Sequence, residues 1–90
     1  MNIDRAKFAS LAATWRLSPR EFEVLLAIID GCAADHALAV RLGVALPTAR
    51  LHVRNLLLKT GFRSKLELLA FLIRHLSNPT DVPEKNPHFH

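Results

Sequence analysis

Helix start and stop signals divide most of this chain of 90 residues into short segments, and they restrict its possible folds more than any other feature. Ser18-Pro19-Arg20-Glu21 combines a capping serine, a proline at the first helical position and a glutamate that can reach back to the cap. Ser64-Lys65-Leu66-Glu67 is a second capping box. A glycine can end a helix in a left-handed conformation, and three follow predicted helices: Gly31, Gly43 and Gly61. These signals predict an all-α fold.

The spacing of apolar residues between these signals predicts five helices, at residues 2–16, 19–30, 35–42, 46–59 and 65–76. No segment has the alternating pattern of a strand. Half of the residues are hydrophobic, which suffices for one modest core in a chain of this length. We expect a core domain at 17–76, an amphipathic N-terminal helix at 1–16 and a flexible proline-rich tail at 77–90.

The charges are segregated along the chain. Residues 36–66 contain no acidic residue and carry six basic ones, here called the basic block: Arg41, Arg50, Arg54, Lys59, Arg63 and Lys65. The net charge of +4 therefore combines +6 in the block with −2 elsewhere. Uncompensated cations favour a polyanion partner such as nucleic acid, whereas a solvated face that only aids solubility is the plainer alternative.

Several classes of protein do not fit the sequence. The single cysteine, Cys32, can form no internal disulfide and provides no metal-binding spacing. No apolar run approaches the roughly 20 residues of a membrane-spanning helix, and no signal peptide is indicated, so we expect a cytoplasmic protein. The acidic residues lie at helix ends, where capping explains them. We therefore expect no enzyme, no metal and no cofactor.

The segments 35–42 and 46–59 have the spacing of a helix-turn-helix. Ala39 and Ala49 are small enough to let two helices cross closely, Gly43 permits a left-handed turn, and Val44 can fill the gap beneath it. At 100° per residue, one face of the second helix is apolar, with Ala49, Val53, Leu56 and Thr60. The opposite face contains Pro47, Arg50, Leu51, Arg54, Asn55 and Leu58.

This outward face suits the major groove of DNA. Arg50 and Arg54 lie one turn apart, and arginine can donate two hydrogen bonds to guanine, while Leu51 can touch a thymine methyl. The sequence therefore predicts a recognition helix that reads bases through these three residues.

Residues 17–75 resemble the DNA-binding domain of LuxR-type (GerE-type) bacterial transcription regulators. The similarity lies in LSPREFEVL at its start, TARLHVRNL in the recognition helix and GFRSKLEL after it. The resemblance implies a four-helix fold, base reading at Arg50, Leu51 and Arg54, and dimerisation through the fourth helix of that domain. It also implies phosphate binding near Thr48, Lys59, Arg63 and Lys65. Full-length members usually carry an input domain before this one, and we expect this chain to act without it.

The sequence departs from the family pattern at three places. Alanine stands where the family usually has a polar helix cap, at Ala34 and Ala45. Leu46 and Pro47 make the first turn of the recognition helix apolar, and Pro47 has no N–H to offer a phosphate.

The last helix is apolar around nearly its whole circumference. We expect Leu66, Leu69, Ile73 and Leu76 to face the core, which leaves a dimer-forming patch of Leu68, Phe71 and Leu72. The alternative is that the N-terminal helix, with Phe8, Leu11 and Trp15, folds back and covers this patch within one chain.

Three interpretations follow. The first is a stand-alone, homodimeric, sequence-specific regulator of bacterial transcription, with double-stranded DNA as its partner and RNA polymerase or another regulator as a further one. The second is a LuxR-like interaction module that modulates other regulators through its last helix. The third, a sigma-factor region with a similar helix-turn-helix, rests on analogy of fold alone.

Overall fold

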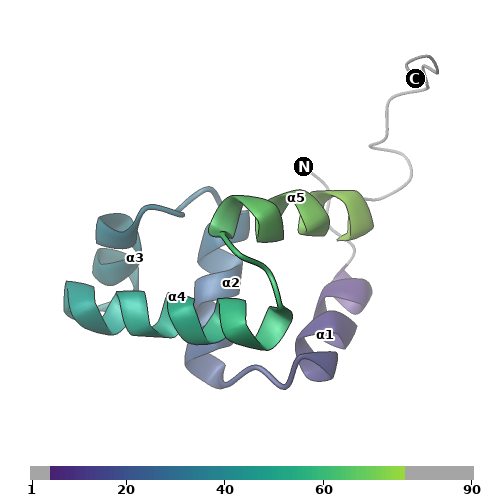
Figure 1. Cartoon of the computed structure of the whole chain (residues 1–90), viewed down its shortest axis with the longest axis horizontal. Helices are drawn as coiled ribbons and strands as arrows, with labels where there is room; N and C mark the ends of the chain where they lie inside the picture. Colours follow the sequence, from purple (N-terminus) through teal and green to yellow (C-terminus); the bar gives the residue numbers. More distant parts are fainter. Residues whose placement is uncertain (1–4, 77–90) are drawn as a thin grey trace, which may run out of the picture.

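The computed structural model describes residues 5–76, which form five helices and no strand (Figure 1). In chain order these are α1 Arg5–Thr14, α2 Pro19–Ile29, α3 Asp35–Leu42, α4 Leu46–Thr60 and α5 Lys65–Leu76. The prediction of an all-α fold is confirmed for this part of the chain. The expected start of the first helix at residue 2 and the expected flexible tail at 77–90 lie outside the described residues. None of the described helices has the length and apolar character needed to cross a membrane.

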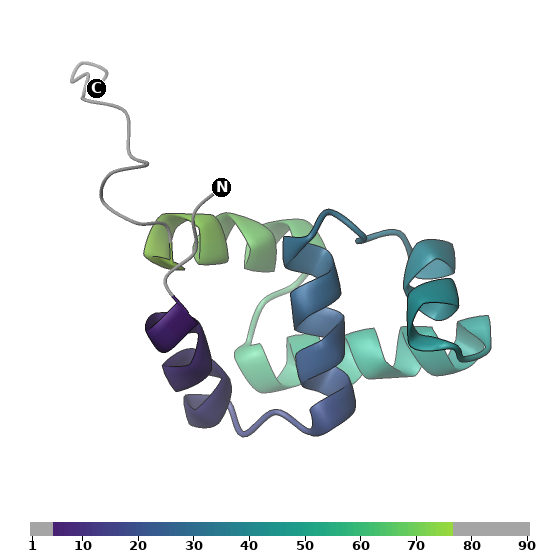
Figure 2. The same ribbon diagram turned by 180° about the vertical axis from the view of Figure 1, so that it is seen from behind.

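Helix α2 is the centre of the packing. It crosses α4 and contacts α3 and α5 as well, so that these helices surround it (Figures 1 and 2). Hydrophobic side chains from all five helices form one core, and eight large ones are almost completely buried: Val24, Leu25, Ile28, Leu38, Leu56, Leu68, Leu72 and Leu76. Burial of this apolar surface is the main stabilising contribution to such a fold.

The two predicted capping boxes differ in the structure. At α2, the Ser18 hydroxyl accepts a hydrogen bond from the Glu21 N–H at 3.1 Å, and the Glu21 carboxylate accepts from the Ser18 N–H at 2.8 Å. At α5, the Ser64 hydroxyl likewise accepts from the Glu67 N–H. The Glu67 carboxylate, however, accepts from the N–H of Arg63 instead of Ser64. The second box is therefore only half formed.

The turn between α3 and α4 has the predicted left-handed residue. Gly43 has φ 69°, and the Val44 N–H donates to the Ala39 carbonyl at 3.0 Å. A Cβ at Gly43 would meet no atom within 4 Å, so glycine is needed here for its backbone conformation and not for space. The N-cap residues of α3 and α4 are Ala34 and Ala45, and neither helix has a side-chain cap, as the sequence predicts.

The prediction that Leu68 and Leu72 face outward from α5 is wrong. Leu68 and Leu72 are 0% and 1% exposed and belong to the core of the single chain, whereas Leu66 is 76% and Ile73 42% exposed. Phe71 is half-buried in a ring cluster, with Trp15 at 6.0 Å and Phe62 at 5.0 Å between ring centroids. Helix α1 packs against α5, and Trp15, which follows α1, contacts Phe71, as expected for a covering N-terminal helix. Because α5 is apolar on every side, its hydrophobic pattern did not determine which face turns inward.

Candidate functional site

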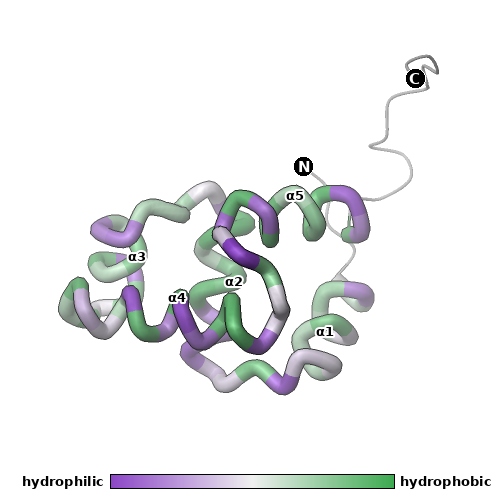
Figure 3. The backbone as a smooth tube through the Cα atoms, in the orientation of Figure 1, coloured by the Kyte–Doolittle hydropathy of each residue, from purple (hydrophilic) through white to green (hydrophobic). Residues whose placement is uncertain are grey.

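Helix α4 presents two distinct faces, as predicted from its sequence. Ala49, Val53 and Leu56 are buried against α2 and α3. The opposite face is exposed, and Figure 3 shows hydrophilic and hydrophobic residues alternating along α4. The arginines Arg50 and Arg54 lie on this exposed face. Two large apolar side chains accompany them: Leu51, 51% exposed, and Leu58, 70% exposed.

A groove of about 380 Å³ runs beside this face. Its polar lining consists of three arginines and one carboxylate, Arg50, Arg54, Arg63 and Asp35. The remaining lining is apolar and comes from Val53, Leu57, Leu58 and Phe62. Such a lining combines hydrogen-bond donors for anionic or polar acceptors with surface for flat apolar groups.

Most cations of the basic block are already paired within the chain. Four of the six contact carboxylates that lie outside the block: Arg41 with Asp30, Arg50 with Asp35, Lys59 with Glu21 and Lys65 with Asp35. Within residues 5–76, the side chains of Arg54 and Arg63 make no ion pair. The groove is therefore the place where the uncompensated positive charge of the block gathers.

The ammonium group of Lys59 is held by partners of its own chain, although part of the side chain is exposed. Its Nζ lies 2.7 Å from Oε1 of Glu21, whose side chain is only 7% exposed, and 3.0 Å from the carbonyl oxygen of Arg16. Burial raises the pKa of the Glu21 carboxyl, but hydrogen bonds from Lys59 and from the Ser18 backbone outweigh it, so the pKa lies below its ordinary value of 4.5. Lys59 thus ties the end of α4 to the start of α2.

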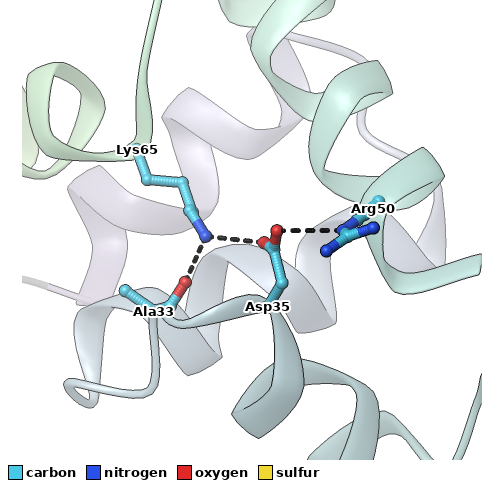
Figure 4. A network of polar contacts seen from close by, with 4 residues as sticks. All are labelled: Ala33, Asp35, Arg50 and Lys65. Carbon is cyan, nitrogen blue, oxygen red and sulfur yellow. Dashed lines mark hydrogen bonds and ion pairs between the residues drawn. The ribbon is translucent and has the colours of Figure 1, made fainter. Parts of the chain in front are cut away.

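Asp35 joins three parts of the chain (Figure 4). Its Oδ1 accepts a hydrogen bond from Lys65 Nζ at 2.7 Å, and its Oδ2 lies 3.4 Å from Arg50 Nε. Lys65 Nζ also donates to the carbonyl oxygen of Ala33. The hydrogen bond from Lys65 lowers the pKa of the Asp35 carboxyl below its ordinary value of 3.8, despite partial burial, and Arg50 lowers it further.

The predicted site residues therefore divide into two groups. The proposed base-reading residues Arg50, Leu51 and Arg54 share the exposed face of α4, and Thr48 and Arg63 are exposed near its two ends. Lys59 and Lys65, expected at phosphates, instead donate to carboxylates and carbonyls of their own chain. A phosphate would have to displace those contacts.

Sequence reasoning missed the two acidic partners in this region. Glu21 was expected only as a cap and Asp35 only as one of the acidic residues at helix ends, yet each holds a lysine of the basic block. These partners are 38 and 30 residues away along the chain. Such contacts leave no periodic signal, and only the tertiary arrangement brings them together.

The described residues contain no cluster of three or more histidine, cysteine or acidic side chains that could hold a metal ion. No protein-family model, no curated protein and no solved structure matches this chain. The groove must therefore be interpreted from its own chemistry. Guanidinium groups beside exposed leucines, on one face of a helix, are suited to bind acceptors and apolar groups together.

Proposed function

We propose that this chain is a sequence-specific DNA-binding transcription regulator of the LuxR type, which inserts α4 into the major groove. The observation that carries this proposal is the exposed face of α4, where Arg54 has no ion pair within residues 5–76 and lies beside Arg50 and Leu51. The helix has 15 residues, about 22 Å in length, and the major groove of B-DNA admits a helix of this kind.

Each exposed residue has a role in this proposal. Arg54 donates to the O6 and N7 atoms of a guanine, Arg50 reads a neighbouring base, and Leu51 contacts a thymine methyl. Thr48, in the first turn of α4, and Arg63, after its last turn, contact the phosphates on either side. The preceding helix α3 lies across the backbone, as the first helix does in other helix-turn-helix proteins.

A homodimer is part of the proposal, although not through the residues first expected. The face of α5 with Leu66, Ala70 and Ile73 is exposed, and in this proposal two copies pack across it so that each presents its α4 to the same duplex. The half-sites would then lie about one helical turn, roughly 34 Å, apart. In sedimentation measurements, Leu66→Glu should convert a dimer to a monomer. A wild-type monomer at all concentrations would contradict this part of the proposal.

The test of base reading combines selection with substitution. Duplexes are selected from a random pool on the wild-type protein, and the affinity of Arg54→Ala is measured on the selected and on a random duplex. We expect a loss of about 1 to 3 kcal/mol on the selected duplex and a much smaller loss on the random one. Arg74→Ala, an exposed arginine near the end of α5, is the matched control. Equal losses of Arg54→Ala on both duplexes would contradict base reading.

The second candidate function is an interaction module that binds other regulators. The exposed apolar side chains favour it, since Val40 is 82%, Leu58 70% and Leu66 76% exposed. Binding of a protein through these side chains should depend little on salt, whereas DNA binding weakens measurably as salt increases. The salt dependence of binding therefore separates the two functions.

A further inference from the structure

The polar lining of the groove contains a single carboxylate, that of Asp35, among three arginines. We propose that Asp35 is a specificity-determining residue, which holds Arg50 by its Nε atom, leaves the terminal nitrogens of Arg50 for a base edge and repels phosphate groups that approach the groove. This inference rests on the proposed function, because it concerns how the α4 face distinguishes one duplex from another.

The geometry fixes Asp35 more firmly than it fixes Arg50. Lys65 Nζ donates to Asp35 Oδ1 at 2.7 Å and also to the Ala33 carbonyl, so the carboxylate is anchored from the α5 side (Figure 4). The contact of Arg50 Nε with Asp35 Oδ2 is longer, at 3.4 Å, and the Arg50 side chain is 60% exposed. The carboxylate therefore stays in the groove, while Arg50 is able to exchange its partner.

The contact occupies only one donor atom of Arg50. A guanidinium has five N–H donors, and the terminal nitrogens take no part in the contact through Nε. They remain available to the two acceptors that a guanine presents in the major groove. Asp35 thus restricts the orientation of Arg50 without consuming the atoms that a base would need, which reduces the entropy lost on binding.

The Asp35 carboxylate should affect the binding of a phosphate more than the binding of a guanine edge. A phosphate carries a full negative charge and is repelled by the carboxylate more than the neutral guanine edge is, although Lys65 at 2.7 Å offsets part of this repulsion. Moving Arg50 from the carboxylate to a phosphate also replaces one charge-assisted hydrogen bond by a similar one, with little gain. Asp35 therefore weakens binding to random DNA more than binding to a selected sequence, which is discrimination by repulsion.

The experiment compares Asp35→Asn with Asp30→Asn on a selected and on a random duplex at one salt concentration. Asp30 is the matched control, because it pairs with an arginine of the basic block, Arg41, at 2.8 Å but does not line the groove. Both substitutions remove one negative charge. We expect Asp35→Asn to raise affinity for random DNA about three- to tenfold and to lower the ratio of selected to random affinity. Asp30→Asn should leave that ratio unchanged.

Equal changes in the two variants, or an unchanged ratio in Asp35→Asn, would overturn the Asp35 inference and leave the proposed function intact. Absence of binding by the wild-type protein to any duplex would overturn both. The Asp35→Asn side chain keeps an oxygen that accepts from Lys65, which favours retention of the fold. If Asp35→Asn unfolds at the assay temperature, the double variant Asp35→Asn/Lys65→Gln replaces the ion pair by an amide pair. This double variant should likewise lower the ratio of selected to random affinity, and an unchanged ratio would overturn the inference.

Discussion

Lys59, near the end of α4, stabilises the fold in a way that its charge alone does not indicate. Lys59 is a cation in a basic helix, yet its ammonium group neutralises Glu21, which is buried beneath it. A buried carboxylate that loses its partner is costly because it has neither water nor a counter-charge. The stability of the fold, more than the binding of phosphate, should therefore depend on Lys59.

We expect Lys59→Met to lower the free energy of unfolding by about 2 kcal/mol, because it leaves the Glu21 carboxylate without its counter-charge. Urea denaturation at pH 7 measures the change. Arg54→Met is the control, since Arg54 is exposed and unpaired within residues 5–76, and it should alter stability by less than about 0.5 kcal/mol. Equal stabilities of the two variants would show that the Lys59–Glu21 pair contributes nothing.

Arg16 is the one described non-glycine residue with a positive φ, at 56°. It follows α1, and its carbonyl accepts from Lys59 while its side chain is exposed. A left-handed conformation costs a non-glycine residue about 1 kcal/mol or more, so Arg16→Gly should raise the free energy of unfolding by up to about 1 kcal/mol. Thermal denaturation tests this, with Arg16→Ala as the control that keeps the strain. A glycine variant no more stable than the alanine variant would contradict the account.

At the scale of helices, the local signals of the sequence predicted most of the fold. Ser18 and Gly43 determine where α2 begins and where α3 ends, and both do so through contacts within a few residues. The buried face of α4 followed from its 3.6-residue period. The orientation of α5 did not, because apolar residues surround it and its covered side depends on contacts with α1, α2 and α4 that its own sequence does not indicate.

The turn between α3 and α4 offers a test at the same scale. Gly43→Ala introduces a methyl group into open space, so only the left-handed backbone opposes it. We expect a loss of about 1 kcal/mol in the free energy of unfolding, measured by urea denaturation. Gly43→Asn should lose less, since asparagine adopts this conformation more readily. A larger loss for asparagine than for alanine would indicate a steric cause instead.

At the scale of the whole molecule, the stability of the fold should depend on pH through two paired carboxylates, Glu21 and Asp35. The pKa values of Glu21 and Asp35 are lowered in the folded chain, so both carboxylates bind protons more tightly when the chain unfolds. Their contribution to stability is present above about pH 5 and is lost as the pH falls through the lowered values. Urea denaturation at pH 7 and pH 3 should therefore show lower stability at pH 3.

The control for this pH dependence is Glu21→Gln. This variant should be less stable than wild type at pH 7, because the ion pair with Lys59 is lost, and its stability should fall less between pH 7 and pH 3. An equal fall in both proteins would mean that Glu21 does not contribute to the acid sensitivity.

The charge distribution of the whole molecule determines which of its cations should be available to contact DNA. Of the six cations in the basic block, Arg54 and Arg63 have no ion pair within residues 5–76, and Arg50 has only the long contact with Asp35. The chain should therefore neutralise few phosphates and release few counterions from the DNA, and the cations that do so should be the arginines of the groove beside α4.

The most direct test of DNA binding by this groove is a salt titration of wild type and Arg63→Ala on one fluorescent duplex, followed by anisotropy. We expect the logarithm of the affinity to fall linearly with the logarithm of salt concentration. The magnitude of the slope should decrease by about one in the variant, because one phosphate contact is lost. A wild-type affinity that does not change with salt, or equal slopes in the two proteins, would contradict DNA binding through this groove.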